Sequence, residues 1–225
     1  AVNCAGLPES LLESELFGHV KGSFTGAFRD KTGKLEMAEG GTLFLDEVGD
    51  MTLRMQGLLL RFLETGELQK VGADRVHTKV ELRVMAATHR DLRDLIISGQ
   101  FREDLFYRLN VIHLVVPPLR ERRDDIRPLA EAVLARHDPK GNGRIVKSIS
   151  DEAMAAMRSY HWPGNVRELE NVIERMIVTC RREVAQVDDL PAEMSARTGS
   201  DRPRTEPRRT LGDDQSTAAS AFGPE

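Results

Sequence analysis

The segment GGTLFLDE, residues 40–47, indicates most directly how this 225-residue chain folds. A short apolar run leads into two adjacent carboxylates, Asp46 and Glu47. Near-continuous apolar runs are typical of strands buried in a parallel sheet, and ligands of such sheets bind beyond the carboxyl ends of the strands. The segment therefore predicts a buried parallel strand with an acidic site at its end.

Other segments share this design. AVNC (1–4) contains Asn3 at its end, and VELRVMAATH (80–89) finishes with Thr88 and His89. A further apolar run, NVIHLVVPP (110–118), is stopped by two prolines. We expect a strand in each of these segments, with the polar ends gathered at one edge of the sheet.

Helical patterns alternate with the strand patterns. PESLLESELFG (8–18) predicts one helix, and TLRMQGLLLRFLETGE (52–67) a second, with Thr52 as its N-cap and Gly66 as its C-terminal stop. RDDIRPLAEAVLARH (123–137) predicts a third, interrupted near Pro128. Strands that alternate with helices favour an α/β fold with a doubly wound parallel sheet.

From about Ser150 the pattern becomes all-helical, which favours a small α-helical lid after the α/β core. SDEAMAAMRSY (150–160) and GNVRELENVIERMIVTC (164–180) each predict a helix, joined by the turn HWPG (161–164). We expect a partial α/β core over 1–120 and a lid over 121–194. Residues 195–225 lose periodicity and gather Pro, Ser, Thr and Gly, so they predict a disordered tail or linker.

Composition and charge indicate where in the cell the chain works. The net charge of −4 gives no general attraction to nucleic acid or membrane, and no apolar run approaches the roughly 20 residues of a membrane span. The two cysteines fit neither a metal spacing nor a disulfide framework. These features favour a cytoplasmic location. The chain starts with Ala1, in what looks like a strand already under way, so we expect it to begin inside a domain.

The two adjacent acids carry the strongest chemical signal. In phosphoryl-transfer sites an acid holds Mg²⁺ and a neighbouring group orients the attacking water. Asp46 is the candidate for the metal and Glu47 for the water. The alternative is an acidic pair that merely begins a solvated loop.

Three arginines are candidates for phosphate contacts, because a guanidinium is permanently charged and bidentate. Arg102 and Arg108 lie in FREDLFYRLN (101–110), on a helix and its end, and Arg167 lies in the first turn of the last long helix. Each has a simpler alternative in salt bridges with neighbouring acids such as Asp104 or Glu168, and spacing alone does not decide between them.

The segment HVKGSFTGAFRD (19–30) places an aromatic ring in an unusual setting. Phe24 and Thr25 lie between Gly22 and Gly26, with charged residues close by. Neither helical nor strand periodicity surrounds this ring, so a core position is disfavoured. The segment predicts a loop with an exposed aromatic tip.

Three stretches together resemble the central ATPase domain of bacterial sigma-54-dependent transcription activators, the AAA+ enhancer-binding proteins. They are residues 13–48, from ESELFGHV to TLFLDEV, then FREDLFYRLNVIHLVVPPLRER (101–122) and YHWPGNVRELENVIER (160–175). The resemblance covers residues 1 to about 191. It implies a ring, usually a hexamer, that binds ATP and Mg²⁺ at subunit boundaries and remodels the sigma-54 RNA polymerase complex.

The resemblance also implies a role for each candidate residue. The loop GSFTGA would contact sigma-54, with Phe24 and Thr25 as the contact pair. Asp46 and Glu47 match the Walker B acids, and Asn3 matches the residue that holds the catalytic glutamate away from water in one nucleotide state. Thr88 matches the first sensor and Arg167 the second, and Arg102 with Arg108 match the fingers that act in a neighbouring subunit. The partner-contacting loop comprises Gly22, Ser23, Phe24, Thr25, Gly26 and Ala27.

The sequence departs from the family pattern at two places. Ser23 stands where alanine is usual, and no G-x-x-x-x-G-K-[ST] phosphate loop occurs in the 225 residues. By the size of a βαβ unit, we expect that loop roughly 30 residues before Ala1. We therefore expect weak or no ATP binding by these residues alone. We also expect DNA binding only through a domain outside them, because no helix-turn-helix pattern follows Pro191.

Two other classes remain open on the sequence alone. One is a non-hydrolysing module in which Phe24 and Thr25 merely dock on sigma factor. The other is a different AAA+ remodeller, such as a protease unfoldase, although the GSFTGA loop disfavours it.

Overall fold

The computed structural model describes residues 1–75, 78–137 and 146–195. It divides into two compact units, residues 1–115 and 116–225, each with its own apolar core. The tail predicted over 195–225 lies outside the described residues, apart from Ser195.

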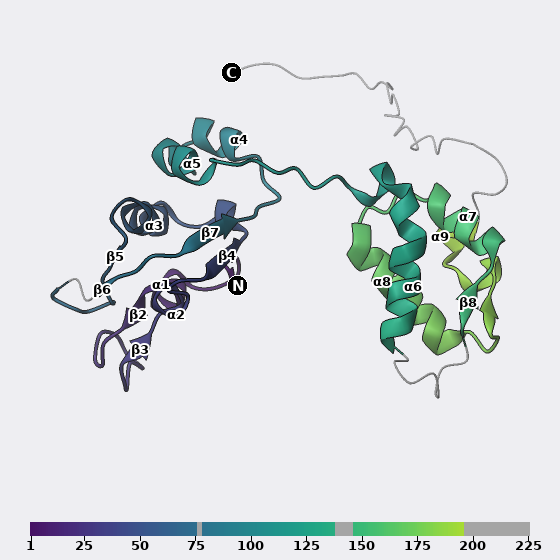
Figure 1. Ribbon diagram of the computed structural model, residues 1–225, viewed down its shortest axis with the longest axis horizontal. Helices are drawn as coiled ribbons and strands as arrows, with labels where there is room; N and C mark the ends of the chain where they lie inside the picture. The colour runs from purple at the N-terminus through teal and green to yellow at the C-terminus, as the bar shows by residue number, and fades with distance from the viewer. Residues whose placement is uncertain (76–77, 138–145, 196–225) are drawn as a thin grey trace, which may run out of the picture. The chain divides into compact units, whose positions relative to one another are not determined.

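The first unit is an α/β domain (Figure 1). Its elements are β1 (Val2–Asn3), α1 (Glu9–Phe17), β2 (Gly18–His19), β3 (Lys31–Thr32), α2 (Lys34–Met37), β4 (Thr42–Asp46), the 3₁₀ turn η1 (Val48–Asp50), α3 (Leu53–Thr65), β5 (Glu67–Leu68), β6 (Thr78–Lys79), β7 (Arg83–Ala86), α4 (Leu92–Ile97) and α5 (Glu103–Leu109).

A parallel sheet in the order β1-β4-β7 organises this unit. Val2 and Asn3 pair with Leu45 and Asp46, and β7 pairs with the other side of β4 along its whole length. Because the strands are parallel and in this register, their carboxyl ends meet at one edge, which confirms the predicted gathering of polar ends.

The two faces of this sheet differ in their covering. Leu43 and Leu45 point to the buried face and are fully enclosed, whereas Phe44 and its cross-strand partner Met85 are 37 % and 44 % exposed. Strands of a parallel sheet are ordinarily covered on both faces. Within the described residues, this sheet has one packed face and one partly open face.

The expected strand at 110–118 is wrong. Within the described residues this run pairs with no strand. Its side chains are 73–81 % exposed at Val111, Ile112, Leu114, Val115 and Val116. Apolar, β-branched residues favour a strand only where a neighbouring strand can pair with them. At the sheet edge, β7 pairs with β4 and with no other strand of the described chain.

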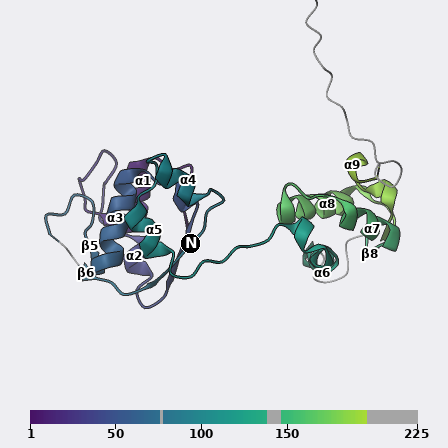
Figure 2. The ribbon, with the colours of Figure 1, turned by 90° about the horizontal axis from the view of Figure 1, so that it is seen from above.

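The helix α3 begins and ends as its sequence predicts. The Thr52 side chain accepts a hydrogen bond from Met55 N–H, and Gly66 adopts a left-handed conformation after the last turn. Its apolar stripe packs into the core of the unit. Figures 1 and 2 show α3 beside α5.

The second unit is mainly helical. Its elements are the 3₁₀ turns η2 (Leu119–Glu121) and η3 (Arg123–Asp125), α6 (Ile126–His137), β8 (Ser148–Ile149), α7 (Asp151–Ser159), α8 (Asn165–Thr179), β9 (Val184–Ala185), the turn η4 (Val187–Asp189) and α9 (Ala192–Ser195). Figure 2 shows α6, α7 and α8 from above.

This unit corrects two expectations. Pro128 does not interrupt a helix: α6 begins at Ile126, so the proline lies in its first turn, where no intrahelical N–H bond is lost. The short parallel pair β8–β9 was not predicted. The helices at 150–160 and 164–180 are confirmed as α7 and α8, and the Ser150 side chain caps α7.

Candidate functional site

The site forms where the strands of the parallel sheet end. Asn3 lies opposite Asp46, and Cys4 N–H donates to Asp46 C=O at 2.8 Å. On the other side of β4, Ala87 N–H donates to Leu45 C=O at 2.8 Å. The structure thus brings Asn3, Asp46, Glu47 and the segment after β7 to one edge of the sheet.

Asp46 and Glu47 differ in their surroundings. Asp46 is half-buried, and its Oδ1 accepts a hydrogen bond from Glu47 N–H at 3.1 Å. Glu47 has a left-handed backbone, with φ 55° and ψ 48°, which is uncommon for a residue other than glycine. Such a conformation at a strand end is typical of functional positions held by their surroundings.

The Glu47 carboxylate contacts the segment that follows β7. Glu47 Oε2 lies 2.7 Å from His89 Nδ1 and 3.3 Å from His89 N–H. The side-chain oxygen of Asn3 accepts a hydrogen bond from Ala5 N–H at 2.8 Å. The sequence indicated that His89 ends a strand pattern, but it did not indicate this contact.

The acidic character of this edge shows in the buried thiol of Cys4. Burial, together with the carboxylates of Asp46 and Asp50, raises the pKa of Cys4 to about 12. A cysteine with so high a pKa is a weak nucleophile near neutral pH. Cys4 is therefore a packing residue, and its raised pKa reflects burial first and the nearby carboxylates second.

The residues at this edge fit a metal held jointly with phosphates. Across 1–75, 78–137 and 146–195, no three His, Cys, Asp or Glu side chains are grouped to hold a metal ion. Mg²⁺ usually takes one or two protein carboxylates and completes its shell with water and substrate phosphates. Asp46 suits that arrangement as a single acid ligand.

Thr88, the expected first sensor, lies just past β7 and next to the turn that follows Glu47. Its Oγ1 accepts a hydrogen bond from Arg90 N–H at 3.1 Å. A Cβ added at Gly49 would lie 2.9 Å from that oxygen, so the close approach needs glycine there.

The two arginines expected to act as fingers lie at opposite ends of α5. Arg102 precedes the helix and binds Asp104 through two hydrogen bonds of 3.0 and 2.6 Å. The hydrogen bond from Arg102 lowers the pKa of the Asp104 carboxyl. Arg108 donates to Leu63 C=O in the last turn of α3, at 2.7 and 3.2 Å. Both arginines are exposed and have intrachain partners.

The loop at 21–30 is a closed turn. Lys21 N–H donates to the Asp30 carboxylate at 2.7 Å, and Gly22 N–H donates to Ala27 C=O at 2.8 Å. The Phe24 ring packs edge-on against His19, with centroids 5.0 Å apart. Phe24 is 37 % exposed, whereas Phe28 is 87 % exposed. The most exposed ring of this loop is therefore Phe28, a position that no sequence pattern indicated.

The base of the loop packs against the segment that follows β5. Val20 N–H donates to Val71 C=O, and Val71 N–H donates to Gly18 C=O. Gly72 has φ +78°, and a Cβ there would lie 2.5 Å from the Cβ of Ser23. Two features therefore require glycine at position 72: its positive φ and the close approach of Ser23 in the loop.

Replacing Gly72 by alanine is expected to destabilise the first unit by about 2–4 kcal/mol, because a left-handed Cβ and a packing clash both contribute. Gly99 is the matched control, since it has φ +70° and open space around it. Gly99→Ala is expected to destabilise the first unit through its left-handed backbone alone, by about 1–2 kcal/mol. Urea unfolding followed by circular dichroism measures both. Equal effects of the two substitutions would contradict the packing of Gly72 on Ser23.

Arg167, the expected second sensor, is exposed in the first turn of α8. The start of this helix is fixed locally: Gly164 N–H donates to Glu168 Oε2, and Leu119 N–H donates to Asn165 Oδ1, both at 2.8 Å. Within the second unit, the bond from Leu119 joins the first turn of α8 to η2.

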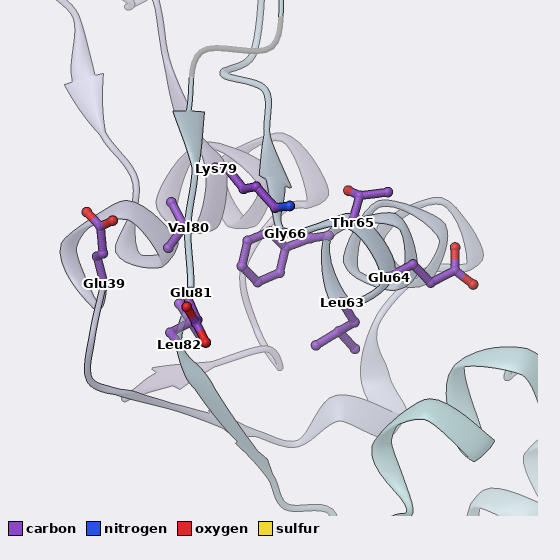
Figure 3. A pocket seen from close by; sticks show the side chains of 10 residues that line it. Glu39, Leu63, Glu64, Thr65, Gly66, Lys79, Val80, Glu81 and Leu82 are labelled. Carbon is purple, nitrogen blue, oxygen red and sulfur yellow. The ribbon is translucent and has the colours of Figure 1, made fainter.

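One cavity of about 630 Å³ lies at the C-terminal end of α3, away from the strand-end acids. It is lined by residues 62–66 and 79–82 together with Glu39. Figure 3 shows Lys79 and the carboxylates of Glu39, Glu64 and Glu81 at different sides of this cavity. This cavity is separate from the strand-end residues Asn3, Asp46, Glu47 and Thr88.

Comparisons with known proteins agree with this architecture, which is that of an AAA+ domain followed by its lid. The sigma-54 interaction domain family matches residues 1–115, and the AAA+ ATPase lid domain family matches residues 120–207. The chain belongs to the sigma-54 interaction domain family of transcriptional regulators.

Individual relatives support this assignment. The chain is 52 % identical over 203 residues to the alginate biosynthesis transcriptional regulatory protein AlgB of Pseudomonas aeruginosa, covering 90 % of this chain and 44 % of AlgB. It is 50 % identical to the DNA-binding transcriptional regulator NtrC of Azospirillum brasilense, covering 92 % and 43 %. The chain thus spans less than half the length of these relatives.

A solved structure matches as well. NtrX from Brucella abortus, in complex with ATP, has a TM-score of 0.74 and 38 % identity, covering 86 % of this chain and 44 % of NtrX. The expected fold class, an AAA+-type α/β core followed by a helical lid, is therefore confirmed. Among the described residues, no helix has the length and apolar character needed to cross a membrane.

Proposed function

We propose that the intact protein containing this chain is an ATP-dependent activator of sigma-54 RNA polymerase. In this proposal a homo-oligomeric ring, in its usual form a hexamer, hydrolyses ATP with Mg²⁺ in the cytoplasm. Hydrolysis changes the position of the loop 21–30, and Phe24 with Thr25 contacts sigma-54. The observation that supports it best is the meeting of Asn3, Asp46, Glu47 and Thr88 at one sheet edge in a member of the sigma-54 interaction domain family.

Roles within the site follow from these positions. We assign the metal to Asp46, water orientation to Glu47, the glutamate switch to Asn3 and the sensors to Thr88 and Arg167. Arg102 and Arg108 would act on nucleotide held by a neighbouring subunit. The nucleotide-handling core would span 1–120 and the lid 121–194. DNA contact would come from a domain outside this chain.

The open sheet face favours this motor over a non-hydrolysing docking module. Phe44 and Met85 are partly exposed on one face of the sheet, β7 has an unpaired edge within the described residues, and residues 111–116 form an exposed apolar run. One further strand beside β7, with a helix over the open face, would pair with the β7 edge and cover Phe44 and Met85. A phosphate loop lies between such a strand and helix in a βαβ unit.

The 225-residue chain alone is expected to bind ATP weakly or not at all, because it carries the acids but no phosphate loop with its amides and lysine. Isothermal titration of this chain with Mg·ATP, beside the same measurement on the full-length protein, checks this. We expect saturable binding by the full-length protein only. ATP hydrolysis by the short chain at an ordinary enzymatic rate would contradict the expectation.

The upstream coding sequence separates the two functions. An in-frame phosphate loop before Ala1 favours the motor, and a start codon at that point favours the docking module. Full-length protein that hydrolyses ATP and activates transcription from a sigma-54 promoter would confirm the proposal.

A further inference from the structure

Three consecutive residues just past β7, 88–90, contact the turn that follows β4. Thr88 lies against Gly49, His89 contacts Glu47, and Arg90 donates to Gly49 C=O at 3.2 Å. Arg90 also pairs with Asp50 at 3.1 Å. The backbone of His89 is therefore fixed from both sides, so its position beside Glu47 follows from the surrounding contacts.

The contact between His89 and Glu47 has a defined donor and acceptor. Where the Glu47 carboxylate is ionised it only accepts hydrogen bonds, and His89 Nδ1 then carries the proton in the 2.7 Å contact. The backbone N–H of His89 approaches the same oxygen, Oε2, at 3.3 Å. Two donors from one residue thus converge on one oxygen of Glu47 and define the direction of its carboxylate.

The left-handed backbone of Glu47 fits a residue that its surroundings hold in place. A left-handed residue persists where its surroundings determine it, and a glutamate side chain has several rotatable bonds that cost rotamer entropy to fix. The His89 side chain is 70 % exposed and that of Glu47 is 27 % exposed. Exposed pairs of this kind contribute little to stability, so the role of the contact lies in geometry.

We propose that His89 is a positioning residue that orients the Glu47 carboxylate for water activation. The proposal rests on the proposed function and assigns to the site a residue beyond the acids, the sensors and Asn3. His89 contacts Glu47 and acts through it. Asn3 and His89 would then be two polar groups that set the direction of the same carboxylate from neighbouring strand ends.

The first test measures ATP hydrolysis by the full-length protein. His89→Ala is expected to lower kcat about tenfold or more while the KM for ATP stays within about twofold, because it disturbs orientation and not nucleotide binding. His89→Asn is expected to retain most of the activity, since its amide can donate to Glu47. Arg93→Ala removes an exposed side chain of α4 and is the matched control, with activity expected to be unchanged.

A double-mutant cycle shows whether His89 acts through Glu47. In the Glu47→Gln background, His89→Ala is expected to cause no further loss of kcat. If the fold-losses of kcat caused by the two substitutions multiply in the double variant, the proposal is overturned. A wild-type kcat in His89→Ala would also overturn it. In either case wild-type hydrolysis still supports the proposed function, so the two failures are distinguishable.

A second readout does not depend on hydrolysis. The ¹⁵N chemical shift of His89 in the 225-residue chain, recorded where the imidazole is neutral, reports which ring nitrogen carries the proton. We expect Nδ1 protonation in the wild-type chain and a shift towards Nε2 protonation in Glu47→Ala. An identical tautomer in both chains would overturn the contact on which the proposal rests. Full-length protein without ATPase activity would overturn both the proposed function and the role of His89 in it.

Discussion

Replacing Phe24 by alanine in the full-length protein is expected to abolish promoter opening while ATP hydrolysis stays within about twofold of wild type. The ring rests edge-on against His19, a contact worth about 0.5–1.5 kcal/mol. A movement of the loop can release so weak a contact, and burial of the ring in a partner then contributes roughly 1.5–3 kcal/mol. Loss of the ring removes the partner contact without touching the strand-end acids.

Phe28→Ala is the matched control for this prediction. It deletes the same ring from the same loop, at a position that is 87 % exposed. Because the partner contact is assigned to Phe24 and Thr25, Phe28→Ala is expected to retain activation. Hydrolysis and open-complex formation measured on one preparation of each variant check both. Equal loss of the two activities in Phe24→Ala would contradict a contact that is separate from the hydrolytic site.

Neutralising Arg102 and Arg108 together is expected to slow ATP hydrolysis roughly 10³–10⁵-fold, as for other arginine fingers. This corresponds to about 4–7 kcal/mol of activation free energy. Both guanidinium groups have intrachain partners, Asp104 for Arg102 and Leu63 C=O for Arg108. These contacts are exposed, so a nucleotide presented by a neighbouring subunit can compete for the arginines.

Mixed assemblies test whether the arginines act between subunits. A subunit with Arg102→Ala and Arg108→Ala, mixed with a Glu47→Gln subunit, is expected to recover part of the hydrolysis that each lacks alone. Recovery requires that one subunit supplies the acid and its neighbour the arginines. Absence of recovery, with assembly confirmed by light scattering, would place the arginines and the acid in the same subunit.

Much of the fold was predictable because local chemistry determines it. The strand ends at Asn3 and Asp46, the cap at Thr52 and the stop at Gly66 all depend on a few neighbouring residues. The run at 110–118 could not be placed in this way, because a strand depends on a partner that its own sequence does not specify. For the same reason the short pair β8–β9 was missed.

The sequence predicted which residues meet at the candidate site, but it did not predict all of their side-chain contacts. Apolar strands with polar ends indicated which residues meet, and the structure brings them to one edge. The contact of His89 with Glu47 depends on a left-handed backbone at Glu47, which nothing in the sequence indicates. The exposure of Phe28 above Phe24 likewise depends on how the closed turn packs on His19.

Promoter opening by the full-length protein with both Arg102 and Arg108 replaced by alanine tests most directly whether hydrolysis moves the loop. If cleavage of ATP between subunits changes the position of Phe24, this variant will form no open complexes at a sigma-54 promoter although it still assembles. Open complexes formed at the wild-type rate would show that activation does not need hydrolysis, and would contradict the coupling of the strand-end acids to the loop.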